Sequence, residues 1–128
     1  MKLTYPALFH HEDGSYWVEF PDLPGCNTFG DTAQETLKSA QEALEGYALT
    51  LIENGEKLPA PTDISDIQID ENSFTSFVQT DLSAYLNNSK AVKKTLTIPE
   101  WLNNQAIANG INFSKVLQEA LIKQLNML

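Results

Sequence analysis

Two sets of apolar residues recur at every second position within the first twenty residues of the chain, with the period of two that β-strands show. Asp13-Gly14 lies midway along this stretch and is a strong signal for a tight turn between two strands. The pattern therefore predicts an N-terminal β-hairpin. The apolar sides of its two strands are Tyr5, Ala7 and Phe9, and Tyr16, Val18 and Phe20.

A third strand, a long helix and a fourth strand are expected next. Residues 21–25 form a loop rich in Pro and Gly, and residues 26–29 are expected to form a short strand. Asp31 or Thr32 then caps a helix that ends at Asn54-Gly55, because Thr32-Ala33-Gln34-Glu35 has the form of a capping box. A polar loop at 63–72 precedes a last strand at 74–81. The expected apolar side of the helix consists of Ala33, Leu37, Ala40, Leu44, Tyr47, Ala48, Leu51 and Ile52.

The C-terminal residues show a strand pattern followed by two helix patterns. Over residues 93–99 the expected buried side carries Leu96 and Ile98. A short helix at 100–109 ends at Gly110, and Asn112 is expected to cap a second helix. The apolar side of that second helix has spacings of three and four, and consists of Phe113, Val116, Leu117, Ala120, Leu121 and Leu125.

These roughly forty residues are too few to bury their apolar sides within one copy. We therefore expect the tail to dimerise, with two strands pairing into an antiparallel ribbon above interlocked helices. A shift of the strand by one residue is disfavoured, because both aliphatic side chains would lose burial, at about 1.5–3 kcal/mol each.

The charge of the chain is divided unevenly between these two parts. Residues 90–128 carry five Lys and two acidic residues, a net of +3. Residues 1–89 carry three Lys and fifteen acidic residues, a net of −12. A basic tail indicates contact with nucleic acid, whereas an acidic body should repel nucleic acid and attract a basic partner. The Lys residues could also form only a solvated face of a dimerisation element.

The composition of the 128 residues excludes several classes of protein. No stretch is long and apolar enough to cross a membrane, and Met1-Lys2 leads directly into a strand pattern without a signal peptide. The single Cys26 excludes an internal disulfide framework and a CxxC metal site, and it is expected to be structural. We therefore expect a cytoplasmic protein.

An enzymatic site is not expected in the body, nor a metal or a cofactor. Metal-dependent hydrolysis of RNA requires carboxylates that converge on divalent metals, but few acidic residues lie on predicted strands, and Glu19 is the one in the middle of a strand. His10 and His11 are neighbours on a strand, so they point to opposite faces and cannot readily share one metal. We expect no catalytic residues.

Two sequence motifs resemble those of a known family. The first is Pro21-Asp22-Leu23-Pro24-Gly25-Cys26 followed by Phe29-Gly30-Asp31-Thr32, and the second is the run from Val78 to Tyr85. In this order, and followed by the tail, they resemble HicB-family antitoxins of type II toxin–antitoxin systems. The tail resembles a ribbon-helix-helix DNA-binding domain. The resemblance extends over essentially the whole chain.

The resemblance implies an α+β fold. An N-terminal β-β-β-α-β partial RNase H-like body would occupy residues 1–82, followed by a linker at 83–92. A ribbon-helix-helix (β-α-α) dimerisation and DNA-binding domain would occupy 93–128. The body would neutralise a HicA-type mRNA interferase toxin, and the tail would autorepress the shared operon as a homodimer or higher oligomer bound to operator DNA.

Candidate site residues follow from this resemblance and from charge. On the ribbon, exposed strand residues contact base edges in the major groove, and the N-terminus of the second helix holds a phosphate through backbone N–H groups. The expected DNA-binding residues are Lys93, Thr95, Thr97, Asn112, Phe113, Ser114 and Lys115. Candidates for toxin contact are the acidic residues Glu19, Asp22 and Asp31, together with the polar side of the long helix.

Two other functions are compatible with parts of the pattern. The two-part layout also suits a ribbon-helix-helix repressor whose body senses a small-molecule ligand. A metal-dependent RNA hydrolase would need Glu19 or Asp22 as metal ligands. The motifs in the body favour the antitoxin over both.

Overall fold

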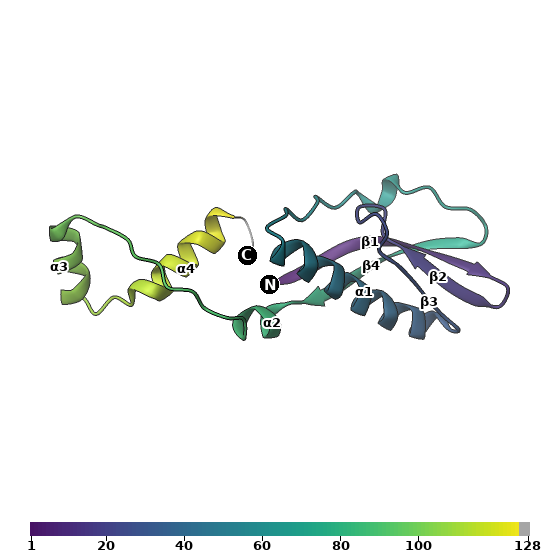
Figure 1. Cartoon of the computed structure of the whole chain (residues 1–128). Helices are drawn as coiled ribbons and strands as arrows, with labels where there is room; N and C mark the ends of the chain where they lie inside the picture. Colours follow the sequence, from purple (N-terminus) through teal and green to yellow (C-terminus); the bar gives the residue numbers. More distant parts are fainter. Residues whose placement is uncertain (126–128) are drawn as a thin grey trace. The chain divides into compact units, whose positions relative to one another are not determined.

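The computed structural model describes residues 1–125, and the last three residues of the predicted tail lie outside the described residues. The chain divides into two compact units, one spanning Lys2–Leu86 and the other running from Asn87 onward (Figure 1). No helix among the described residues has the length and apolar character needed to span a membrane.

The body contains a four-stranded antiparallel sheet in the order β3-β2-β1-β4. Asp13 and Gly14 join the first two strands with φ angles of 51° and 80°, which both lie in the left-handed region that a tight hairpin turn requires. The predicted hairpin is therefore confirmed. The strands are β1 (Lys2–Glu12), β2 (Ser15–Glu19), β3 (Asn27–Gly30) and β4 (Ser73–Asp81).

The third strand begins one residue later than the sequence predicted. Cys26 does not belong to β3 but lies in the core at the end of the preceding loop, where its side chain is buried. Its N–H donates to the carbonyl of Leu23, which closes the loop before the strand begins. The turn thus sets the start of β3, and the short apolar pattern alone did not reveal it.

Helix α1 (Ala33–Glu53) covers one face of the sheet (Figure 1). Thr32 is the N-cap, and its hydroxyl accepts from the N–H of Glu35 at 3.1 Å, so the capping prediction is confirmed. The predicted apolar side was partly wrong, because Leu37 is 38% exposed while the polar Thr36 is fully buried. The N-terminal turns of α1 pack against the end of β3, which brings Thr36 rather than Leu37 into the interior.

The core lies between α1 and the sheet. Tyr5, Ala7 and Phe9 contribute the side chains of β1 that face the helix, and Ala40 and Leu44 meet them from α1. The opposite side of β1 is also buried at two positions, Pro6 and Leu8. β1 is therefore a central strand that is apolar on both sides.

Short helices follow the sheet. The loop expected at 63–72 contains the 3-10 helix η1 (Ile64–Asp66), and the expected linker at 83–92 begins with α2 (Ser83–Asn87). The tail contains α3 (Glu100–Ala108) and α4 (Phe113–Gln124), close to the predicted limits. Gly110 has a φ of 66° and ends α3 as expected.

The strand predicted at 93–99 is not formed in the single chain, where residues 88–99 are neither helix nor strand. A strand requires a hydrogen-bonded neighbour, and the neighbour predicted from the sequence is a second copy. The strand prediction is thus wrong for one copy, and its pairing in a dimer stays a prediction.

Candidate binding sites

The tail has no core of its own. Among residues 83–125, every side chain is exposed or only partly buried. Its apolar side chains instead line a groove of about 840 Å³ formed by the extended segment and both helices. Members of this apolar groove are Leu96, Ile98, Leu102, Ile111, Phe113, Val116 and Leu117. An exposed apolar surface of this kind is typical of a site that another molecule covers.

The extended segment contributes alternate residues to the apolar groove. Leu96 and Ile98 line it together with Lys94. Thr95 and Thr97 do not line it, and both are exposed. Lys93 likewise is exposed and outside the lining, so the three candidate base-contacting side chains are accessible. Their contact with DNA stays a prediction.

Asn112 caps α4 as predicted. Its side-chain Oδ1 accepts a hydrogen bond from the N–H of Lys115 at 3.0 Å. Phe113 and Ser114 line the apolar groove, whereas Lys115 is exposed beside it. The helix N-terminus therefore lies at the border between the groove and a positive side chain, and its predicted contact with a phosphate is untested.

The three acidic candidates in the body lie in different surroundings, and no hydrogen bond among the described residues joins them. Asp22 accepts from the N–H and the hydroxyl of Thr62 at 2.9 and 2.5 Å, so its carboxylate holds the loop after α1. Asp31 is exposed just before α1, and its N–H donates to Glu35. Glu19 lies on the sheet face opposite α1. Their contact with a toxin stays a prediction.

The sheet face opposite α1, which we call the open face, carries aromatic side chains that the sequence analysis did not single out as a site. Phe29 is 76% exposed and Phe77 is 58% exposed. Phe29 pairs with Trp17, and Trp17 pairs with His10, so these three side chains form a row across β3, β2 and β1. Their signal in the sequence was alternation with core residues, which indicates the side of a strand but not whether that side is covered.

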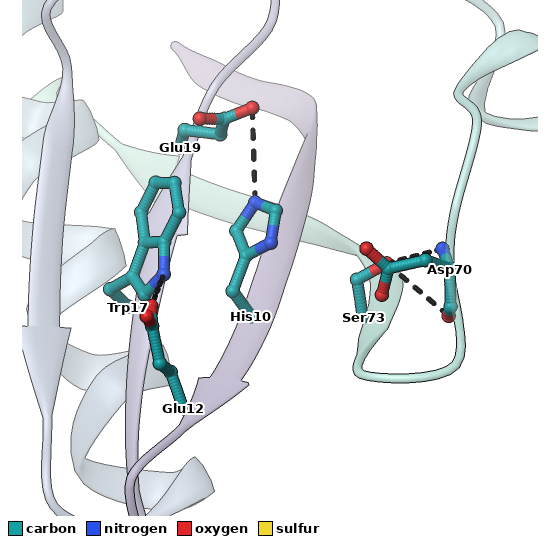
Figure 2. A network of polar contacts seen from close by, with 6 residues as sticks. All are labelled: His10, Glu12, Trp17, Glu19, Asp70 and Ser73. Atoms are coloured by element: carbon teal, nitrogen blue, oxygen red, sulfur yellow. Dashed lines mark hydrogen bonds and ion pairs between the residues drawn. The ribbon is translucent and has the colours of Figure 1, made fainter.

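Two members of this row, His10 and Trp17, are stacked on each other (Figure 2). The rings of His10 and Trp17 lie 3.9 Å apart and are nearly parallel. The indole N–H of Trp17 donates to Glu12 at 3.2 Å, and Oε1 of Glu19 lies 3.9 Å from Nε2 of His10. That nitrogen is enclosed and has no hydrogen-bond partner among the described residues. The open face thus presents an aromatic centre with a carboxylate on each side.

The other residues considered for chemistry, His11 and Cys26, lie in surroundings that give each of them a structural role. His11 stacks on Tyr16 at 4.4 Å, on the side of the sheet opposite His10, as expected for neighbours on a strand. Burial raises the pKa of the Cys26 thiol to about 11, so the thiol is protonated at neutral pH and weakly nucleophilic. Within residues 1–125, no three His, Cys, Asp or Glu side chains gather as metal ligands.

The fold and these sites define a two-unit α+β protein with an acidic body and a basic tail whose apolar groove is exposed in the single chain. Residues 5–120 match the family model described as HicB-like antitoxin of bacterial toxin–antitoxin systems. The chain belongs to this family, and its role is that of an antitoxin.

Relatives and solved structures agree with this assignment. The chain is 30% identical over 102 residues to a 14.9 kDa protein of Haemophilus phage HP1, covering 78% of this chain and 76% of that protein. It is 36% identical over 70 residues to Antitoxin HicB 1 of Photorhabdus laumondii, covering 54% of this chain but only 45% of that relative.

Two solved structures are similar over nearly the whole chain. A toxin–antitoxin complex from Streptococcus pneumoniae has a chain that is 34% identical with a TM-score of 0.63, covering 97% of this chain and 99% of that one. The antitoxin HicB of Burkholderia pseudomallei is 26% identical with a TM-score of 0.60, covering 96% and 98%. The similarity therefore includes both the body and the tail.

Proposed function

We propose that this antitoxin neutralises a small basic toxin of the HicA type through its acidic body and represses its own operon through its tail. The body would be the partial RNase H-like domain at 1–82. The tail at 93–128 would be a ribbon-helix-helix domain joined to the body by residues 83–92. The chain would act by binding alone, without catalysis or a cofactor.

The observation that carries this proposal is that the body and the tail differ both in the sign of their net charge and in whether they have a buried core. The body has its own core and a net charge of −12 over residues 1–89, which suits binding to a basic protein. The tail has a net charge of +3 and no buried side chain in its described part, up to residue 125, which suits a dimer that forms on an acidic polymer. The whole-length similarity to a chain of a toxin–antitoxin complex supports the same division.

A homodimer of tails would bury the apolar groove. Two copies of Leu96 and Ile98 would then lie beneath a paired ribbon, with Thr95 and Thr97 on its outer side. Lys93 and the two Thr residues could contact base edges in the major groove, while Lys115 and the N-terminus of α4 contact a phosphate. Contacts between bodies would permit a higher oligomer.

The experiment compares the two activities of the full chain. Operator binding is measured by fluorescence anisotropy on the promoter duplex, and neutralisation is measured as growth rescue when the adjacent small reading frame is induced. Thr95→Ala or Thr97→Ala should weaken operator binding by about 1–3 kcal/mol. Growth rescue should be unchanged, because the substitution lies outside the body.

A matched control removes a charge elsewhere. Lys57→Ala changes an exposed loop residue of the body and should leave operator binding within about twofold of wild type at fixed salt. Loss of both activities in the Thr95 variant would contradict the division of labour. A toxic neighbour that the unmodified full chain does not neutralise would contradict the antitoxin mechanism itself.

A further inference from the structure

The open face of the sheet has the composition of a protein-binding surface. Exposed Phe29 is the cross-strand partner of Trp17, and exposed Phe77 is the cross-strand partner of buried Pro6, with buried Leu8 on the same face. Aromatic side chains are enriched at the centres of protein interfaces, and an exposed apolar patch on a small domain marks a binding site. The helix α1 covers the other face, so the open face is available to a partner.

The charges on the open face determine which partner fits. Strand alternation places Glu12 and Glu19 on this face beside the row of aromatic rings, and His10 is the only other titratable group between them. Lys2 and Asp81 are opposite each other in the strand register at the far end of β1 and β4, so one charge of each sign lies there. Two copies stacked through this face would bring four carboxylates together in a low-dielectric interface, which is costly.

A basic protein would instead place Lys or Arg side chains against these carboxylates. An Arg guanidinium can also stack on an aromatic ring, and Phe29 and Trp17 provide such rings next to Glu19. The stacked His10 and the bonded Glu12 hold Trp17 in place before binding (Figure 2). A surface that is already ordered loses little conformational entropy when the partner docks.

From these observations we infer that the open face, centred on Trp17, Phe29 and Phe77 with Glu19 as its main charge, is the surface on which the basic toxin docks. This inference rests on the proposed function and specifies the site that the function requires. Glu19 was a candidate from the sequence, and the aromatic side chains around it come from the structure. The toxin is recognised by apolar contact at the centre and by charge at the border.

The test uses the full chain and the purified product of the adjacent reading frame. Phe29→Ala and Phe77→Ala should each weaken the complex at least tenfold, as expected for aromatic residues at an interface centre. Glu19→Lys should slow association, and the difference from wild type should shrink at high salt. Glu45→Lys is the matched control, because it makes the same change at an exposed position of α1 and should have a much smaller effect.

Fold and operator binding are measured for every variant, so that a loss of toxin binding is not confused with unfolding. Glu19→Gln provides a milder substitution if the Lys variant is unstable beside His10. Wild-type affinity in Phe29→Ala and Phe77→Ala would overturn the inference while leaving the antitoxin function intact. A smaller oligomer with unchanged toxin affinity would assign the open face to a second copy. Failure of the unmodified chain to bind the product would instead contradict the proposed function.

Discussion

Gly30 lies at the end of β3, where the strand approaches the first turns of α1. A Cβ atom added at Gly30 would lie 2.7 Å from the backbone nitrogen of Thr36, which cannot move without moving the helix. We therefore expect Gly30→Ala to destabilise the body by about 1–3 kcal/mol. Urea unfolding followed by Trp17 fluorescence measures this, on a Trp101→Phe background that removes the signal of the tail.

The control for this prediction lies within α1. A Cβ atom at Gly46 meets nothing within 4 Å, and Gly46 occupies a helix interior. Gly46→Ala should therefore stabilise the body by up to about 1 kcal/mol, because Ala has the higher helix propensity. Equal effects of the two substitutions would show that close packing at Gly30 is not the cause.

Burial of Cys26 makes the stability of the body sensitive to alkaline pH. Desolvation raises the pKa of its thiol from 9.0 to about 11, so above pH 9 the unfolded chain loses the proton first. The free energy of unfolding should therefore fall as pH rises from 9 toward 11. Burial also raises the pKa of the Tyr5 hydroxyl, so a smaller decline should remain in Cys26→Ala. Urea titrations at several pH values measure both slopes, and identical slopes would rule out the thiol.

At the scale of elements, the N-cap residue of α4 contributes to the stability of the helical structure in the tail. Asn112→Ala removes the acceptor for the N–H of Lys115 and should cost about 1 kcal/mol of helix stability. Far-UV circular dichroism during thermal unfolding should show earlier loss of helix, accompanied by weaker operator binding. Asn112→Ser retains a capping hydroxyl and should behave almost like wild type. If the Ala and Ser variants melt together, the cap is not important for the tail.

Elements with strong local signals were predictable from the sequence, and those set by tertiary contact were not. The Asp13-Gly14 turn, the Thr32 cap and the end of α3 at Gly110 follow from backbone chemistry that a few adjacent residues determine. The buried side of α1 differs from the predicted one, because the close approach of Gly30 brings Thr36 into the interior. Helix α2 was not predicted, because its five residues are too few to show a helical period in the sequence.

The candidate sites also contain some residues that the sequence predicted and others that only the tertiary structure reveals. Glu19 was found from charge, whereas Phe29 and Phe77 were missed because an apolar strand residue is usually covered. Only the sheet order, with α1 on a single face, shows that these two side chains remain exposed. The exposure of Thr95 and Thr97 agrees with their alternation with Leu96 and Ile98, which line the apolar groove. Their proposed contact with DNA depends on a second chain.

At the scale of the whole molecule, the second compact unit begins at Asn87, and its residues 88–99 are neither helix nor strand and contain three of the Lys residues. Trypsin should therefore cut first after Lys90, Lys93 or Lys94 and release a body that keeps its core. Bound operator DNA should slow cleavage after Lys93 and Lys94, which mass spectrometry of timed digests would detect. Cleavage after Lys38 within α1 should be slow in all samples, and early loss of this helix would contradict the division into units.

The lack of any buried side chain among residues 83–125 has a consequence for how operon repression would depend on antitoxin concentration. Under the proposed pairing, a single tail leaves its apolar groove open to water, and only two tails together form a DNA-binding surface. While pairs are the minor species, their amount varies with the square of the free chain, so halving the supply lowers the number of pairs about fourfold. The rate of transcription of the operon would then rise steeply as the antitoxin concentration falls, without a separate regulatory protein.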